Sequence, residues 1–383
     1  MDPIYHRPQL ATDLARRLLH PGVLDEGLRS GLFLSGLRRT GKTTFVRMDL
    51  IPALQNAGAL VIYVDLWTDT SISPAILTRS AIRQALKALQ SPTSLAPKYL
   101  KRVKSVGLGV AGLKFDFHID SVGEEGGTTL ADAFLAVVDQ AQTNLVFIMD
   151  EVQQAITTED GNSMLLAMKA ARDAINQRPD TPGRFLFVGT GSHRAMVSEL
   201  TARRNQAFAG AVAQPYPVLG PDYVAYERKR MQPALRKHTP SLAAIGAAFD
   251  RLGHRPEDLR KALHQLSTAA IIHNEVDATF DVIVDTLRRG AADLELRTLE
   301  NLGTLATAIF SRIASSKGDS RGVFSTAAAA EYSKAVGRDV KVEEIQPVAD
   351  RMLDANLIMR KRHGVYAVTD PFVQQLWLEQ HAE

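Results

Sequence analysis

Gly36-Leu37-Arg38-Arg39-Thr40-Gly41-Lys42-Thr43 is the stretch of this 383-residue chain that decides the fold. It fits the pattern G-x-x-x-x-G-K-[ST], the phosphate-binding P-loop. The mostly apolar residues Leu32–Ser35 before it predict a short buried strand, and Thr43–Met48 after it predict the start of a helix. In a strand–loop–helix unit, backbone N–H groups and the helix dipole converge on one anion. The stretch therefore predicts a phosphate site in an α/β fold.

The side chains of this loop have different expected roles. Lys42 would reach the β- and γ-phosphates of a nucleotide, and the Thr43 hydroxyl would bind Mg²⁺. Arg38 and Arg39 would either help to neutralise a triphosphate or face solvent. The residues expected to hold the nucleotide are Gly36, Leu37, Arg38, Arg39, Thr40, Gly41, Lys42, Thr43 and Thr44.

A second motif follows another apolar run, Leu145–Met149, which predicts a buried strand. Because acids at the carboxyl end of such a strand lie beside the P-loop in doubly wound sheets, we expect Asp150 to bind Mg²⁺ through water. Glu151 would orient and deprotonate the attacking water. P-loop proteins with two such acids in tandem carry an extra strand between the two motifs, and the strand predicted at Leu60–Asp65 is available for that place.

Further candidate residues come later in the first half. The strand predicted at Phe185–Val188 leads to Thr190 and Ser192. A hydroxyl there would contact the γ-phosphate or the attacking water, and a capped turn is the alternative. Arg203 and Arg204 would act as a finger in the site of a neighbouring subunit, or would lie on a solvated helix face.

The segment Gly253–Arg260 joins two predicted helices. Pro256 at this joint would pack on an adenine ring. Arg260, or less favourably Arg255, would reach the γ-phosphate. A plain turn between two helices is the alternative.

Strand-like and helix-like segments alternate up to about residue 215, which predicts α/β layering. We expect a helix over Ser73–Gln90, a hairpin within Lys98–Asp120, and a helix capped by Thr128 or Thr129. The pattern is mostly helical over Pro221–Arg289. The expected domains are a P-loop ATPase core over 1–218, a helical lid over 219–296 and a winged helix-turn-helix over 297–383.

The last domain is expected from the order of its elements, three helices followed by a two-stranded wing and a closing helix. Pro347 is compatible with the third helix only if it lies in the first turn. The predicted helices are Leu302–Ser315, Ala327–Val336 after a Ser325-Thr326 cap, Val342–Leu353 and the segment from Asp370; the predicted strands are Leu357–Arg360 and Val365–Val368.

Composition sets the class of protein. Hydrophobic residues make up 45% and charged residues 23% of the chain, as in soluble globular proteins. There is no cysteine, so a disulfide, a thiolate metal site and a cysteine nucleophile are excluded. The sequence shows neither a secretory signal nor a run of 18 apolar residues, and we expect a cytoplasmic protein without membrane contact. A net charge of +3 does not decide whether it binds nucleic acid.

Together these motifs resemble the archaeal-type ATPase family, P-loop proteins of the STAND/AAA+ group distantly related to origin-recognition ATPases. Gly36–Thr43 is similar to the family's Gly-x-Arg-Arg-x-Gly-Lys-Thr loop. Asp150–Gln153 resembles its Asp-Glu-aromatic-Gln motif, with Val152 in place of the aromatic residue. Gly253–Pro256 is similar to its Gly-Gly-x-Pro joint, with His254 in place of the second glycine.

The resemblance covers most of the chain and implies an ASCE/AAA+-like parallel sheet, a helical lid and a winged helix. Gly189–Ser192 is similar to the family's sensor-1 turn, which gives Thr190 that role. The implied activity is binding of ATP and Mg²⁺ with slow hydrolysis to ADP and phosphate, coupled to a conformational switch. A homo-oligomer or a partner protein is compatible with this activity.

Two functions remain open for the winged helix. Arg360, Lys361 and Arg362 form a basic wing that suits contact with the phosphates or the minor groove of double-stranded DNA. The third helix of the domain carries four acids, which would repel phosphates and favour a protein partner instead. A small-molecule kinase is a third, weaker alternative, because tandem acids and a winged helix favour hydrolysis coupled to movement. The four acids are Glu343, Glu344, Asp350 and Asp354.

Overall fold

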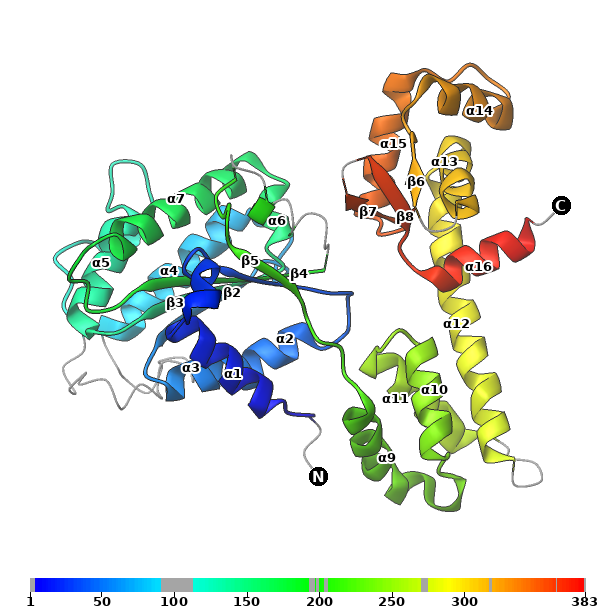
Figure 1. The fold of residues 1–383 in the computed structure, drawn as a ribbon, viewed down its shortest axis with the longest axis horizontal. Coiled ribbons are helices and arrows are strands. Elements are labelled where there is room, and N and C mark those ends of the chain that lie inside the picture. Colours follow the sequence, from blue (N-terminus) through cyan, green and yellow to red (C-terminus); the bar gives the residue numbers. More distant parts are fainter. Residues whose placement is uncertain are drawn as a thin grey trace. The chain divides into compact units, whose positions relative to one another are not determined.

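The structure is a computed structural model that describes residues 4–90, 113–192, 197, 200–202, 206–269, 275–316, 319–362 and 364–381. The chain forms two compact units, Met1–Val218 and Leu219–Glu383. Figure 1 shows an α/β first unit and a second unit built mainly of helices. No helix in the described ranges is long and apolar enough to cross a membrane.

The first unit is built on a parallel five-stranded sheet with the order β2-β3-β4-β1-β5. Every residue of β1, β3 and β4 is buried, as expected for parallel strands that are covered on both faces. The strands are β1 (Leu32–Ser35), β2 (Leu60–Asp65), β3 (Leu145–Asp150), β4 (Phe185–Gly191) and β5 (Val212–Pro215).

The lateral order of the strands corrects one expectation. The prediction that Leu60–Asp65 lies between the P-loop strand and the acid-bearing strand is wrong, because β4 occupies that place. The segment forms β2, which pairs only with β3 among the sheet strands. Tyr63 and Asp65 of β2 are partly exposed, whereas β4 is buried throughout. Complete burial suits the centre of the sheet, and partial exposure suits its edge.

Helices cover both faces of this sheet in a three-layer arrangement (Figure 1). Side chains of β3 alternate between two apolar clusters: Val146 and Ile148 join the cluster of α1 and α3, whereas Phe147 and Met149 join that of α4, α5 and α7. The helices are α1 (Pro8–Leu19), α2 (Lys42–Phe45), α3 (Ile51–Asn56), α4 (Pro74–Gln90), α5 (Leu130–Ala141), α6 (Gln153–Ile156) and α7 (Glu159–Asn176), with the short turns η1 (Val23–Arg29), η2 (Val46–Leu50) and η3 (Ile119–Ser121).

Two local predictions in this unit have different outcomes. Thr129 caps α5, because its hydroxyl accepts a hydrogen bond from the Asp132 amide at 3.1 Å. The first part of the expected hairpin, residues 98–112, lies outside the described residues. Its second strand is wrong, since residues 113–118 form no strand. The alternating apolar residues there, Leu113, Phe115 and Phe117, pack on the cluster beneath α4 and α5 instead.

The second unit begins with a helical part in which α9, α10, α11 and α12 pack together around buried aromatic and aliphatic side chains such as Tyr223, Phe249 and Leu263. The 26-residue helix α12 contacts α10 and α11 and also α13 and α16. The expected domain boundary at 296/297 falls within this helix. The elements are α9 (Pro221–Leu235), η4 (Arg236–His238), α10 (Leu242–Arg251), α11 (Pro256–Thr268) and α12 (Val276–Asn301).

The remaining part has the element order of a winged helix-turn-helix, with three helices, an antiparallel sheet of order β6-β8-β7 and a closing helix. Ser325 caps the second helix as predicted. Pro347 lies inside α15, beyond its first turn, so the expectation for this proline is wrong. The elements are α13 (Thr304–Ser315), β6 (Ser320–Arg321), α14 (Thr326–Val336), α15 (Val342–Asp354), β7 (Ile358–Arg362), β8 (Val365–Val368) and α16 (Pro371–Gln380).

Candidate functional site

The loop between β1 and α2 forms the centre of the candidate site. Its first amide, that of Gly36, donates to the carbonyl of Gly191 at 3.1 Å, so the loop leaves the sheet beside the end of β4. Arg39 and Gly41 have φ angles of 63° and 92°, in the left-handed region. Glycine suits the second of these positions because it adopts this conformation without a Cβ clash. The helix then begins at Lys42.

Side chains within the loop fix its shape. Lys42 is only 5% exposed, and its ammonium donates to the carbonyls of Gly36 and Leu37, each at 2.7 Å. The Thr40 hydroxyl donates to the same Leu37 carbonyl at 2.8 Å. Lys42 thus places a positive charge at the centre of a loop of backbone amides, as a phosphate site requires.

The helix that follows the loop contains a π-helical turn, η2, in which the Ile51 amide donates to the Val46 carbonyl. Pro52 directly follows Ile51 and has no amide hydrogen to donate, which accounts for the altered bonding pattern. Asp49 lies within the turn, is buried, and accepts bonds from His6 Nδ1 at 2.7 Å and the Arg7 amide at 3.0 Å. The N-terminal segment is therefore held against the P-loop helix.

Tyr216 adds to this contact. Its ring lies 5.2 Å from the Arg7 guanidinium and 5.5 Å from the Phe45 ring. A Cβ on Gly36 would meet the Tyr216 Cβ at 3.5 Å, so this tyrosine also borders the first residue of the loop. The sequence did not indicate these contacts, because each joins residues that are far apart in the chain.

Asp150 at the end of β3 is wholly buried, and its carboxylate is hydrogen-bonded to neighbouring groups. Its carboxylate accepts hydrogen bonds from the Thr190 hydroxyl of β4, from the Tyr63 hydroxyl of β2 at 3.1 Å and from the Glu151 amide at 3.2 Å. Three neighbouring strands therefore meet at this acid. Contact of Thr190 with a γ-phosphate or with the attacking water stays a prediction.

Glu151 has a φ angle of 57°, an unusual conformation for a residue with a side chain. Its Oε2 accepts bonds from the Ser192 hydroxyl at 3.0 Å and from the side-chain amide of Gln153. Gln153 also donates to the Ser192 hydroxyl at 3.0 Å. The carboxylate is therefore held in one orientation at the carboxyl edge of the sheet.

Burial changes the acidity of the groups around these acids. Burial raises the pKa of the Tyr63 hydroxyl far above its ordinary value, and the negative charge of Asp150 raises it further, so this hydroxyl stays a donor. Burial also raises the pKa of Asp65, against a bond from the Trp67 amide that lowers it, and the carboxylates of Asp150 and Glu151 add to the rise. Negative charge is thus concentrated where these strands end.

This arrangement fits a magnesium ion that arrives with a nucleotide. The described part of the chain contains no cluster of three or more His, Asp or Glu side chains that would hold a metal by itself. Mg²⁺ is usually bound by one or two carboxylates, with phosphates and water as its other ligands. The Asp150 carboxylate and the Thr43 hydroxyl at the start of α2 are oxygen groups of the required kind.

Arg38 of the P-loop does not extend freely into solvent. Its guanidinium lies 4.4 Å from the centre of the Trp67 ring, and its Nε donates to the Ser192 hydroxyl at 3.4 Å. Trp67 follows β2 and, like Tyr63, was not among the candidate residues indicated by the sequence. Gln153 was indicated only as the last residue of the Asp150–Gln153 motif. Arg203 and Arg204 lie outside the described residues.

The candidates from the 253–260 segment belong to the second unit. Pro256 is the first residue of α11, and Arg260 on the same helix lies 3.3 Å from Glu227, whose side chain is fully buried. His254 adopts a φ angle of 55° where the family pattern has glycine, and its ring packs edge-on against Phe249 at 5.2 Å. This packing offsets the strain of the left-handed backbone.

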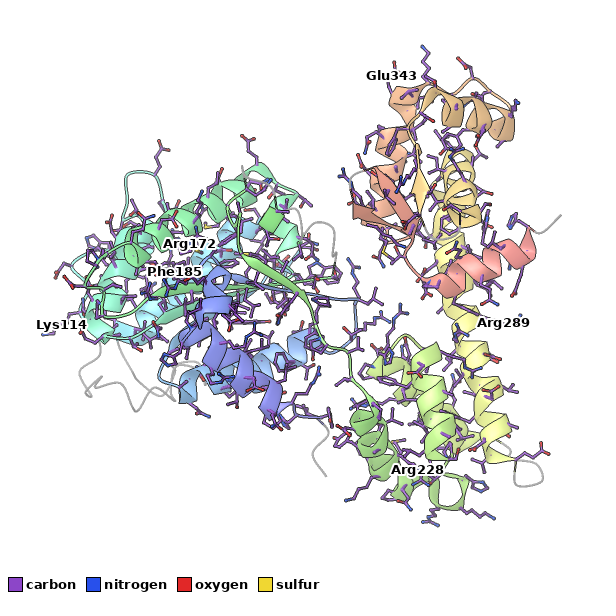
Figure 2. The ribbon with its side chains drawn as sticks, in the orientation of Figure 1. Lys114, Arg172, Phe185, Arg228, Arg289 and Glu343 are labelled. Atoms are coloured by element: carbon purple, nitrogen blue, oxygen red, sulfur yellow. The ribbon has the colours of Figure 1, made fainter. Side chains whose placement is uncertain are left out.

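The expected basic wing is strand β7 and the turn after it. Lys361 forms an ion pair with Asp319 at 3.0 Å, and Arg360 is partly buried. The first turn of α15 carries Glu343, which is exposed and is labelled in Figure 2, and Glu344, which pairs with Arg338 at 2.8 Å.

Comparisons with known proteins identify the fold. A search of solved structures finds a Walker-type ATPase of Pyrococcus abyssi, with a TM-score of 0.53 and 17% identity over 98% of each chain. It also finds the ORC2 protein of Aeropyrum pernix with ADPNP and ADP, with a TM-score of 0.54 and 13% identity over 100% of this chain and 98% of that chain. A scan against models of protein families and a search of curated proteins find no match. The similarity therefore establishes a P-loop ATPase fold with a helical C-terminal region.

Proposed function

We propose that this chain is a cytoplasmic ATP-dependent switch of the AAA+/STAND type, which binds ATP with Mg²⁺ and hydrolyses it slowly to ADP and phosphate. The observation that carries the proposal is the meeting of the Lys42 loop with the Asp150–Glu151 pair, joined through β4. Thr190 of β4 donates to Asp150, and Gly191 accepts from the first amide of the loop. The P-loop ATPase fold of the structural neighbours supports it.

Each group of the site then has a task. Lys42 would exchange its bonds to the loop carbonyls for bonds to phosphate oxygens. Asp150 and Thr43 would hold the magnesium ion, which supplies positive charge to the phosphates when it is bound. Glu151 would accept a proton from the attacking water, and Thr190 would keep Asp150 oriented. In the second unit, Pro256 would contact the adenine and Arg260 the γ-phosphate.

A pair of substitutions tests this proposal. Lys42→Ala should abolish ATP binding measured by calorimetry, whereas Glu151→Gln should bind ATP normally but lose turnover by about 100-fold or more. Lys114→Ala and Glu159→Gln are matched controls, because both residues are exposed on the first unit; Lys114 is labelled in Figure 2. Wild-type ATP affinity in Lys42→Ala would overturn the site, and undiminished turnover in Glu151→Gln would remove its role as the base.

For the output of the switch we propose double-stranded DNA, bound through the wing residues Arg360, Lys361 and Arg362. The basic composition of β7 supports this. A protein partner is the second candidate, favoured by the acidic helix α15 and by the ion pair that Lys361 already makes with Asp319. Arg203 and Arg204 are proposed as finger residues in a homo-oligomer, in which one copy would complete the site of another.

A further inference from the structure

Trp67 is a large aromatic residue that the proposed reaction leaves unexplained. It follows β2, remains 43% exposed, and carries the guanidinium of Arg38 at 4.4 Å from its ring centre. A guanidinium at this distance from an indole face is stabilised by the ring's negative quadrupole. The ring therefore holds one side of the Arg38 guanidinium.

The Nε of Arg38 is connected to the Glu151 carboxylate through one hydroxyl, that of Ser192. Ser192 accepts from Arg38 Nε at 3.4 Å and from Gln153 Nε2 at 3.0 Å, and it donates to Glu151 Oε2 at 3.0 Å. A serine hydroxyl has one proton and two lone pairs. With both acceptor positions occupied, the proton of Ser192 is directed to Glu151.

We propose that Trp67 and Arg38 are positioning residues for Glu151, acting through the Ser192 hydroxyl. The ring fixes the guanidinium, the guanidinium fixes the orientation of the hydroxyl, and the hydroxyl fixes the carboxylate that would activate water. The phosphate-binding loop is thereby connected to the base by side chains as well as by the sheet. This inference rests on the proposed ATPase activity, and it assigns Arg38 a role other than neutralising phosphate charge.

Substitutions separate these two roles of Arg38. Arg38→Lys keeps the positive charge but lacks the planar Nε donor that reaches Ser192. It should leave the Kd for ATP within about two-fold of wild type while kcat falls about 10-fold, because a misplaced base loses part of its contribution. Arg178→Lys, on a partly exposed arginine paired with Asp139, is the matched control.

The ring is tested in the same way. Trp67→Ala should lower kcat about as much as Arg38→Lys, and Trp67→Phe, which keeps an aromatic face, should recover most of the rate. Circular dichroism and thermal unfolding should stay close to those of wild type, since 43% of the residue is exposed. In a Trp377→Phe background, Trp67 is the sole tryptophan, and its emission should change when ATP saturates the protein.

The results distinguish this inference from the proposed function. If wild-type protein binds no ATP in calorimetry, the proposed function fails. If it binds and hydrolyses ATP but Trp67→Ala keeps the wild-type kcat, the positioning role alone is refuted. The same holds if Arg38→Lys loses affinity instead of rate, because Arg38 would then be a phosphate ligand.

Discussion

Gly189 lies in β4 where the strand passes the ring of Phe33. A Cβ at this position would meet two ring atoms of Phe33 at 2.6 Å, closer than packed atoms tolerate. Phe33 is fully buried against Phe187 and Phe208, so its ring has no space into which to move. The absence of a side chain is therefore a packing requirement at the centre of the sheet.

Gly189→Ala should accordingly destabilise the first unit by about 1–3 kcal/mol, the usual cost of overpacking a core. Gly246→Ala in α10 is a suitable contrast, because nothing lies within 4 Å of a Cβ there, and the change should stabilise that helix by about 0.5–1 kcal/mol. Urea unfolding of both variants measures the difference. Equal stability of Gly189→Ala and wild type would contradict the packing argument.

The motif residues of the candidate site could be named from the sequence because local spacing encodes them. Lys42 lies within a fixed loop pattern, and Asp150 and Glu151 directly follow a recognisable apolar strand. Tyr63 and Trp67 could not be found in this way. Their contacts to Asp150 and Arg38 depend on how β2 is placed beside β3, which no local pattern records.

At the scale of elements, charged residues join α11, α12 and α16 within the second unit. Arg255, which precedes α11, lies 3.4 Å from Asp370, the residue that caps α16. Arg288 of α12 lies 3.7 Å from the ring centre of Phe372. Glu295 of α12 is partly buried beside this group. Its pKa is raised from the ordinary 4.5 to about 7, chiefly by burial and also by the negative charge of Asp370, against the opposing charge of Arg255.

The raised pKa makes stability depend on pH in a defined direction. Between pH 4.5 and 7 the folded chain keeps a proton on Glu295 that the unfolded chain releases, so stability falls as pH rises, by at most about 3 kcal/mol. Glu295→Gln has no charge to bury. Its free energy of unfolding, measured by chemical denaturation, should equal that of wild type near pH 5 and exceed it at pH 8.

Glu300→Gln, at an exposed position of the same helix, should show no such pH-dependent gain. An equal stability difference between Glu295→Gln and wild type at both pH values would show that this carboxyl is not buried as described.

Elements with strong local patterns were predicted within a few residues, among them α4, β3 and the strands of the wing. Their lateral arrangement was not, because the apolar runs of β2 and β4 look alike in sequence, although β4 and not β2 lies beside β1. The position of Pro347 in its helix could not be predicted from local pattern either. Its missing amide argues against a position inside α15, but the buried residues Ile345, Val348 and Met352 hold the helix together across it.

At the scale of the whole molecule, the proposed DNA contact has a measurable electrostatic signature. Each phosphate that the wing neutralises releases counterions, so the logarithm of affinity should fall linearly with the logarithm of salt concentration. Charge reversal at Arg360 and Arg362 should weaken duplex binding and flatten this slope. A double reversal at Arg289 and Arg297, both exposed on α12, changes the net charge equally and should have little effect.

Fluorescence anisotropy with a short duplex at several salt concentrations measures these slopes, with and without ATP. Absence of binding at low salt, together with no effect of the reversal at Arg360 and Arg362, would leave a protein partner as the proposed target of this part of the chain.

The sequence of elements along the chain could be inferred because each has its own pattern and because the resemblance supplied an order for them. The division of residues 219–383 into a helical lid and a winged helix stays a prediction. The expected boundary at 296/297 cuts through α12, which packs against the helices before it and those after it. Phe280 is buried near the start of this helix. Near its end, Ala292, Leu296 and Leu299 join the core of α13–α16. A shared helix carries no composition change by which to recognise a domain end.

The backbone of Glu151 has one last consequence. A side chain in the left-handed region costs about 1 kcal/mol relative to glycine. Selection for thermal robustness alone would thus tend to replace this glutamate by glycine. In a laboratory evolution experiment that selects for heat tolerance and not for nucleotide turnover, we expect Glu151 to be replaced early. Retention of Glu151 when turnover is selected as well would show that the residue serves turnover despite its backbone strain.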